Sequence, residues 1–240
     1  MLIYCKDLTL HDIIFILNQQ RLLMTTYFFL AIFLISGIIH LYASYTRNVR
    51  LRAITKPFIV SSLLIYYVCK ANPVTFTMCL ALFFSWLGDV LLIPNKLKIF
   101  ISGAISFMIS HIFFVLSFTP YINLSVIPIW LIIVIPMIYI FAALVIVHYM
   151  VPYIHKPLHI PMTGYLIINA LNNCAAFYML MSKPCIATAV VFFGTTFFFI
   201  SDSILYHVRF KTTTRWKSHF PVMLTYILAE FFITQGMLML

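Results

Sequence analysis

Apolar runs of roughly 20 residues, separated by short clusters of basic residues and prolines, follow one another along most of the chain. A run of this length forms a helix that crosses about 30 Å of hydrocarbon, at about 1.5 Å per residue. A bilayer offers no hydrogen bonds to the backbone, so consecutive runs of this kind fold as packed helices. The pattern therefore predicts an all-α, polytopic integral membrane bundle.

The runs divide the chain into about eight transmembrane helices. The expected spans are residues 24–45, 57–70, 73–93, 99–119, 124–149, 160–181, 184–206 and 219–239. Residues 1–22 are interpreted as an N-terminal interfacial arm, which leaves residues 23–240 as a single eight-helix transmembrane domain. The second span is short if it starts at Pro57, so it either begins earlier or is re-entrant. The fifth is expected to kink at Pro128 and Pro136, which membrane helices tolerate.

Composition supports the membrane class. Hydrophobic residues make up 64% of the chain and charged residues 8%, whereas a soluble domain has about 25% charged residues. The five cysteines are scattered and form no CxxC pair, so neither a disulfide framework nor a thiolate metal site is expected.

Lysine and arginine are concentrated in alternate loops. Most of the 15 basic residues fall in the loops after the first, third, fifth and seventh spans. The positive-inside rule therefore places these odd-numbered loops in the cytoplasm and both termini on the lumenal or outer side. The formal net charge of +10 then reflects this bias, so membrane lipids are expected partners and nucleic acid is not.

Three of the five acidic residues, Asp89, Asp202 and Glu230, are the only charges in long apolar runs. An ionised carboxylate near a helix centre in hydrocarbon costs roughly 2.5–3.5 kcal/mol, so such residues usually face a bundle interior or a wet cavity. The two aspartates are expected about 6 Å inside the cytoplasmic ends of parallel helices, with His111 and Glu230 deeper, at about 15–18 Å. These depths are compatible with one shared cavity.

Other polar residues accompany the acids. Ser85 lies one turn before Asp89 and Tyr226 one turn before Glu230, so each pair shares a helix face. The polar residues of the sixth span are Tyr165, Asn169, Asn172 and Asn173. The asparagines either bond between helices or line a pocket, and His111 is either a core residue or part of the site. For the aspartates, the structural alternative is a buried pair that fixes helix register.

Five segments carry a resemblance to a known family. They are Lys56-Pro57, SWLGDVLLI (85–93), FISGAISFMISHIFFVLSF (100–118), FGTTFFFISDSILYHVRF (193–210) and VMLTYILAEFFI (222–233). In order and spacing they resemble the signature blocks of the YhhN/TMEM86 family of membrane lysoplasmalogenases, from about residue 50 to residue 237.

The resemblance implies an eight-helix bundle and maps the family's proposed catalytic acids onto Asp89 and Asp202, and its histidine onto His111. The chain departs from the family at two positions. Glu230 stands where the family usually has glutamine, and Phe114 stands where it commonly has tyrosine. Both changes bear on substrate preference and pH optimum more than on the fold.

The resemblance implies hydrolysis of the vinyl-ether bond of lysoplasmalogens to a fatty aldehyde and glycerophosphocholine or glycerophosphoethanolamine. Acid cleaves vinyl ethers, because protonation of the outer alkene carbon gives an oxocarbenium ion. Two carboxyls in a low-dielectric pocket can supply one protonated and one ionised group. Asp89 and Asp202 are hypothesised to be that pair, with support from His111 and Glu230. The residues expected to bind substrate are Lys56, Ser85, Tyr165, Asn169, Asn172, Asn173 and Tyr226.

Two other functions use similar residues. A proton-coupled membrane carrier or lipid transporter would use the buried Asp, Glu and His side chains as a relay. A metal-dependent lipid hydrolase could draw on His148, His155 and His159, but these fall in a proline-broken loop away from the acids. No metal or other cofactor is therefore expected. A eukaryotic member of the family is expected in the endoplasmic reticulum.

Overall fold

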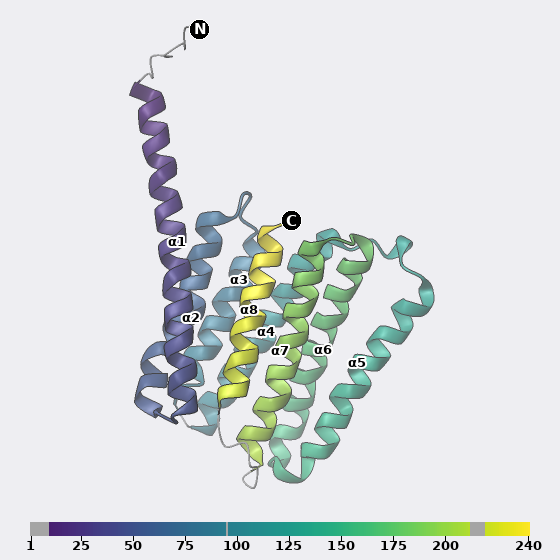
Figure 1. Ribbon diagram of the computed structural model, residues 1–240. Helices are drawn as coiled ribbons and strands as arrows, with labels where there is room; N and C mark the ends of the chain where they lie inside the picture. The colour runs from purple at the N-terminus through teal and green to yellow at the C-terminus, as the bar shows by residue number, and fades with distance from the viewer. Residues whose placement is uncertain (1–9, 95, 212–218) are drawn as a thin grey trace.

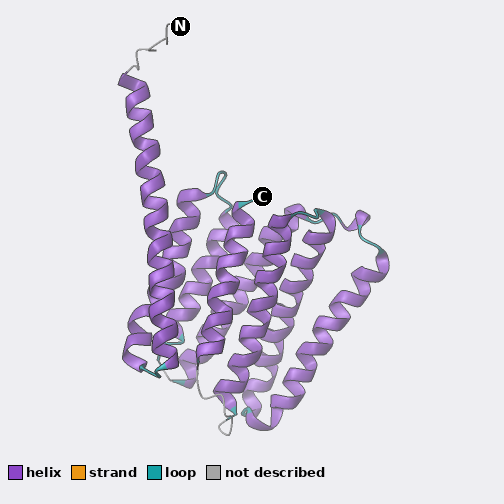
Figure 2. Cartoon of the chain, in the orientation of Figure 1, coloured by secondary structure: helices purple, strands orange, loops and turns teal. Residues whose placement is uncertain are grey.

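The computed structural model describes residues 10–94, 96–211 and 219–240, and these form α-helices joined by turns and short 3-10 helices, without a strand among them (Figures 1 and 2). The eight helices are α1 (Leu10–Tyr45), α2 (Val49–Lys70), α3 (Phe76–Leu91), α4 (Leu97–Phe118), α5 (Ile129–Met150), α6 (His159–Ser182), α7 (Ile186–Phe210) and α8 (Phe220–Leu238). The predicted all-α bundle of eight helices is confirmed.

Six helices form a ring around a polar interior. Helices α2, α3, α4, α6, α7 and α8 pack against one another in this order, and α8 closes the ring on α2. Helix α1 packs outside the ring against α2 and α8, and α5 packs outside it against α6 and α7. Figure 1 shows α1 and α5 at opposite edges of the bundle. The ring brings together helices that are far apart in the sequence.

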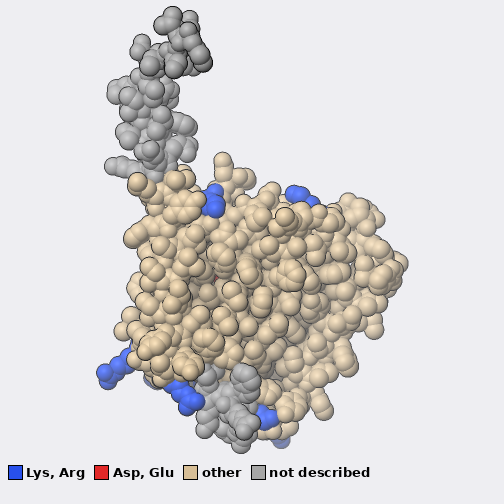
Figure 3. All heavy atoms as spheres, in the orientation of Figure 1, with Lys and Arg blue, Asp and Glu red and all other residues tan. Residues whose placement is uncertain are grey.

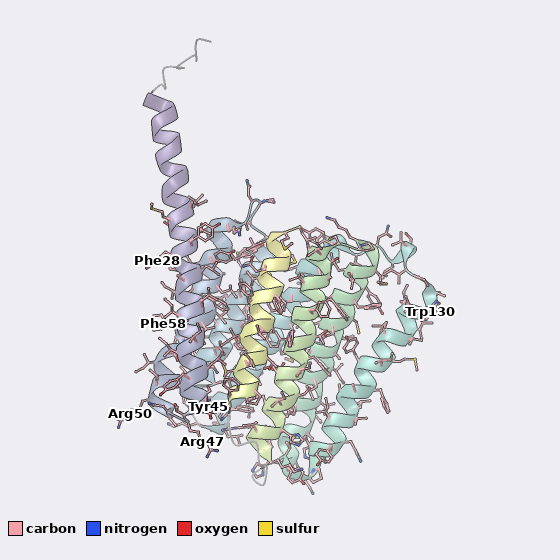
Figure 4. The ribbon with its side chains drawn as sticks, in the orientation of Figure 1. Phe28, Tyr45, Arg47, Arg50, Phe58 and Trp130 are labelled. Atoms are coloured by element: carbon pink, nitrogen blue, oxygen red, sulfur yellow. The ribbon has the colours of Figure 1, made fainter. Side chains whose placement is uncertain are left out.

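The outer surface is that of a multi-pass membrane protein. Of the described helices, α1, α2, α4, α5, α7 and α8 are long and apolar enough to cross a membrane by length and composition. Large side chains such as Phe28, Phe58 and Trp130 project from the bundle (Figure 4), and each is more than half exposed. Exposed apolar surface on this scale is expected where lipid, not water, surrounds the helices.

Apart from the start of α1, three helix boundaries differ from the sequence prediction by four residues or more. Helix α2 begins at Val49, eight residues earlier than predicted, with Pro57 inside it. Helix α7 continues to Phe210, so Asp202 lies about 12 Å from that helix end and not 6 Å. Helix α5 starts after Pro128 and continues through Pro136 as one element. The earlier start of α2 was one of the two alternatives for that span, and α5 is shorter than predicted because the helix begins only after Pro128.

Helix α1 is continuous from Leu10 to Tyr45 and crosses the predicted boundary at residue 22. The division into an arm of residues 1–22 and a domain of residues 23–240 stays a prediction, and residues 1–9 lie outside the described residues. Figure 1 shows the first part of α1 extending beyond the rest of the bundle.

One end of the bundle carries the α1–α2, α3–α4, α5–α6 and α7–α8 connections, and we call it the basic end. Arg47 and Arg50 project from it (Figure 4). The space-filling view shows lysine and arginine at both ends of the bundle, and no acidic side chain among the described residues of the face drawn (Figure 3). The placement of the basic end in the cytoplasm stays a prediction.

Two glycines allow α7 and α8 to approach closely. A Cβ atom added at Gly194 would lie 2.8 Å from the Ile233 backbone nitrogen, and one added at Gly236 would lie 2.7 Å from the Ala187 carbonyl oxygen. Real Cβ atoms do not approach backbone atoms this closely. Small residues at such crossings are what lets membrane helices pack along their backbones.

Replacement of Gly236 by alanine should therefore destabilise the bundle. We expect a loss of about 1–3 kcal/mol in the free energy of unfolding, because the added methyl group must push α7 from α8. The measurement is thermal or denaturant unfolding of the purified protein in detergent. Gly164→Ala is the matched control, since no atom lies within 4 Å of a Cβ atom at Gly164. Equal effects of the two substitutions would contradict the close packing of α7 on α8.

Candidate active site

The two aspartates on α3 and α7 line a common cavity of about 80 Å³ inside the ring of helices. Lys56 of α2 and Tyr226 of α8 line the same cavity, and Phe107 of α4 forms part of its wall. Asp89 is 1% exposed and Asp202 is 4% exposed, so both carboxyls are enclosed by protein and meet solvent only through the cavity.

Asp89 is held by an ion pair and a hydroxyl group. The Lys56 ammonium lies 3.2 Å from Asp89 Oδ1, and the Tyr226 hydroxyl donates to Asp89 Oδ2 at 2.9 Å. Lys56 reaches this position because α2 begins at Val49, which places Lys56 within a helix and not in the predicted loop. A buried carboxylate is tolerated where a cation and further hydrogen bonds compensate its lost hydration.

Asp202 has a different environment, made of neutral donors. The Tyr165 hydroxyl donates to Asp202 Oδ2 at 2.5 Å, and the Asn169 amide donates to the same oxygen at 2.6 Å. His111 Nε2 lies 3.5 Å from that oxygen. The Asn173 amide in turn donates to Asn169 Oδ1 at 3.4 Å, which helps to orient the Asn169 side chain. All these contacts fall on Oδ2, so Oδ1 is left for a ligand in the cavity.

His111 is fixed on both sides. The Asn172 amide lies 3.2 Å from His111 Nδ1, so as donor it leaves the proton of a neutral ring on Nε2, facing Asp202. The Phe198 ring packs edge-on against His111, with 4.5 Å between ring centroids. His111 is therefore part of the polar cluster around Asp202.

Glu230 of α8 is the third buried acid in the bundle. Its side chain is fully buried, and within the described part of the chain neither carboxyl oxygen has a hydrogen-bond partner. It is close to Ser85, Asp89 and Asp202, but it does not line the cavity. Ser85 itself is 2.8 Å from Ser110 Oγ, in a contact between α3 and α4. Buried groups without a protein partner are usual positions for internal water.

The chain is similar to one known family of proteins. A sequence model of the YhhN family matches residues 51–237, from α2 to the end of α8. The chain belongs to the YhhN family. Among curated proteins and among solved structures, no match to the chain was found.

The match to the YhhN family covers every candidate residue discussed above. The structure brings Asp89, Asp202, Lys56 and Tyr226 to one cavity. The predicted residues Tyr165, Asn169 and His111 contact Asp202, whereas Asn172 and Asn173 contact their neighbours. Most residues expected to bind substrate thus orient the acids instead of facing an empty space.

Three basic residues at the cavity were not identified from the sequence as part of the site: Arg52, Arg209 and His219. The sequence could have indicated two of them by their spacing. Arg52 precedes Lys56 by one turn and Arg209 follows Asp202 by two turns, so each pair shares a helix face. His219 lies just before α8, and no sequence pattern indicated that it belongs to the site. Burial and the positive charge of Arg52 lower the pKa of His219 to about 4.

The histidines of the α5–α6 connection and a large apolar groove of this YhhN-family chain lie away from the aspartates. Among the residues that the structure describes, no group of three or more His, Cys, Asp or Glu side chains could hold a metal ion. His159 Nε2 is 2.9 Å from the Ile154 carbonyl. A larger, apolar groove of about 700 Å³ lies between α5 and α7, and none of the predicted site residues lines it.

Proposed function

We propose that the chain is a lysoplasmalogenase, a hydrolase that cleaves the vinyl-ether bond of a lysoplasmalogen lipid. The observation that carries this proposal is the pair of carboxyls from α3 and α7 at one small cavity, each in a different environment. Two carboxyls in unlike environments are the usual means of having one acid and one base at a single pH. Membership of the YhhN family supports the same reaction.

Asp202 is the proposed acid. Both oxygens of Asp89 are engaged, one by Lys56 and the other by Tyr226, so this carboxyl is suited to remain ionised. The contacts of Asp202 fall on one oxygen, and its Oδ1 can carry a proton to a substrate in the cavity. Asp89 then stabilises the cation that forms and accepts a proton from water.

The reaction balances with water alone. The proton of Asp202 adds to the outer alkene carbon, and the electron pair of the double bond forms the new C–H bond. This leaves an oxocarbenium ion at the carbon that bears the ether oxygen. Water adds to that carbon and gives up a proton, which yields a hemiacetal. Its collapse breaks the carbon–oxygen bond and protonates the glycerol oxygen, and the overall reaction restores the protonated Asp202. The products are a fatty aldehyde and a glycerophospho compound.

The remaining residues act on the acids in this proposal. Tyr165 and Asn169 fix the orientation of Asp202, and Tyr226 that of Asp89. Asn172 and Asn173 hold His111 and Asn169, and Glu230 adds a third acid behind the pair. An ER location, if the source is eukaryotic, and a cytoplasmic basic end belong to the same proposal.

The decisive experiment supplies purified protein in detergent with a lysoplasmalogen and with its saturated ether analogue. We expect aldehyde from the vinyl ether only, because the saturated ether has no alkene carbon to protonate. In D₂O, the aldehyde, trapped at once by reduction, should carry one deuterium on the carbon next to the carbonyl. Cleavage of both lipids, or an aldehyde without deuterium, would contradict protonation of the alkene.

The carrier is the competing function that this experiment also tests. A proton-coupled carrier or lipid transporter would release no aldehyde and would move lipid or protons across a proteoliposome membrane without turnover. The buried acids and histidine are compatible with either function. Aldehyde formation that depends on the aspartates would favour the enzyme.

A further inference from the structure

A second cavity, of about 270 Å³, opens at the basic end beside the aspartate cavity, and we call it the outer cavity. Its polar lining consists of His40, Arg52, Lys56, Arg209 and His219. All but His40 also line the aspartate cavity, so the two spaces share a wall of basic residues. A molecule in the outer cavity would therefore lie directly beside the carboxyl pair.

The outer cavity is positively charged and lacks a compensating acid. Within the described part of the chain, no Asp or Glu lines it, and its other lining residues are aliphatic. Asp89, which lines the neighbouring aspartate cavity, is already paired with Lys56. The charge of Arg52 has no such partner in the cavity lining. Enclosing like charges is unfavourable unless an anion neutralises them.

Two buried nitrogens at the outer cavity have no hydrogen-bond partner among the residues that the structure describes. His40 is fully buried, and its Nδ1 lies 2.8 Å from Thr55 Oγ1, whereas its Nε2 has no hydrogen bond to the described residues. The Nε atom of Arg52 is buried and unpartnered in the same sense. A buried polar group without a partner is unfavourable, and such groups are usually satisfied by water or by a ligand.

The positive-inside bias alone does not explain this cluster. Arg50 lies two residues from Arg52 on α2, but it is exposed and projects away from the bundle (Figure 4). A basic residue that serves only topology needs no burial. Arg209 is also drawn inward, over the Phe100 ring, with 4.8 Å from its guanidinium carbon to the ring centroid.

We propose that the outer cavity is a phosphate-binding site, with Arg52 and Lys56 as its principal anion ligands and His40, Arg209 and His219 around them. Guanidinium groups bind phosphate through two parallel N–H···O bonds, and a lysine adds a point charge. In a lysoplasmalogen, the glycerol unit alone separates the phosphate from the vinyl ether. A phosphate in the outer cavity would thus place that bond at the carboxyl pair. The identity of this lipid rests on the proposed function, whereas phosphate binding does not.

The test compares two substrates with and without a phosphate. For Arg52→Gln, we expect the KM for lysoplasmalogen to rise about tenfold or more, with kcat within about threefold of wild type. For 1-O-alkenylglycerol, which lacks the phosphate, the same variant should equal wild type. Arg50→Gln, on the exposed face of α2, should leave KM and kcat unchanged for both substrates. If Arg52→Gln raises the KM for both substrates equally, or for neither, the proposed phosphate site is wrong.

A binding measurement separates this site from the reaction. The probes are inorganic phosphate and lysophosphatidylethanolamine, which has no vinyl ether, each against chloride at equal ionic strength. The readout is the thermal unfolding midpoint. Stabilisation of wild type by the lipid alone assigns the site to a head group, and stabilisation by both probes assigns it to the phosphate itself. In either case Arg52→Gln should abolish the shift. No shift in wild type, or an equal shift in Arg52→Gln, would overturn the proposal even if vinyl ethers are cleaved.

Discussion

Asp202→Asn should reduce aldehyde release from lysoplasmalogen by about 10²–10⁴-fold, the contribution usual for a general acid. The asparagine oxygen can still accept from Tyr165 and Asn169, so the contacts between α6 and α7 survive the substitution. What is lost is the proton on the other oxygen. We therefore expect a variant that inserts and unfolds like wild type but does not turn over. The measurement is aldehyde formation by purified protein, alongside thermal unfolding.

Ser203→Ala is the matched control for Asp202→Asn. Ser203 follows Asp202 on α7, donates to the Phe199 carbonyl of its own helix at 2.7 Å, and faces the apolar groove instead of the aspartate cavity. This variant should keep wild-type activity. If Asp202→Asn retains more than roughly a tenth of wild-type activity, Asp202 is not the acid.

Asp89→Asn should lose both hydrolysis and stability. The substitution leaves the Lys56 ammonium, whose side chain is 13% exposed, without its counter-ion. Removing one partner of a buried ion pair costs about 3–5 kcal/mol, and the partial exposure of Lys56 places the expected loss at the lower end. Thermal unfolding in detergent measures this loss, and aldehyde release measures the loss of the reaction.

Adding Lys56→Met to Asp89→Asn separates the role of Asp89 in the reaction from its role in stability. Removal of both charges relieves the unpaired ammonium, so Lys56→Met with Asp89→Asn should recover most of the stability. Activity should stay at the level of Asp89→Asn, because the carboxylate is still missing. Recovery of activity together with stability would instead mean that Asp89 only fixes the register of α2 and α3.

The helical architecture was predictable because it depends on a local property. Each apolar run must satisfy its backbone internally, so the number of helices follows from the number of runs. The helix boundaries were less predictable. Pro57 suggested a helix start, but α2 begins at Val49, since a membrane helix tolerates an internal proline where neighbours satisfy the backbone. That difference places Lys56 beside Asp89.

The candidate site was predictable in part for a similar reason. A single acid in an apolar run is unfavourable unless it faces a polar interior, so Asp89 and Asp202 were identifiable from the sequence. Their unlike environments were not, because each depends on how one helix packs against the next, which the sequence of either helix alone does not specify. Asp89 is paired across more than 30 residues with Lys56, and Asp202 with Tyr165 and Asn169.

The sequence by itself determined that this chain spans the membrane as a helical bundle with buried acids, since length, hydropathy and isolated charge are properties of each segment alone. Only the tertiary structure decided which acid meets a lysine and which meets neutral donors, and that Arg52 and His40 share a cavity. These relations depend on the order of helices around the ring, which no local pattern encodes.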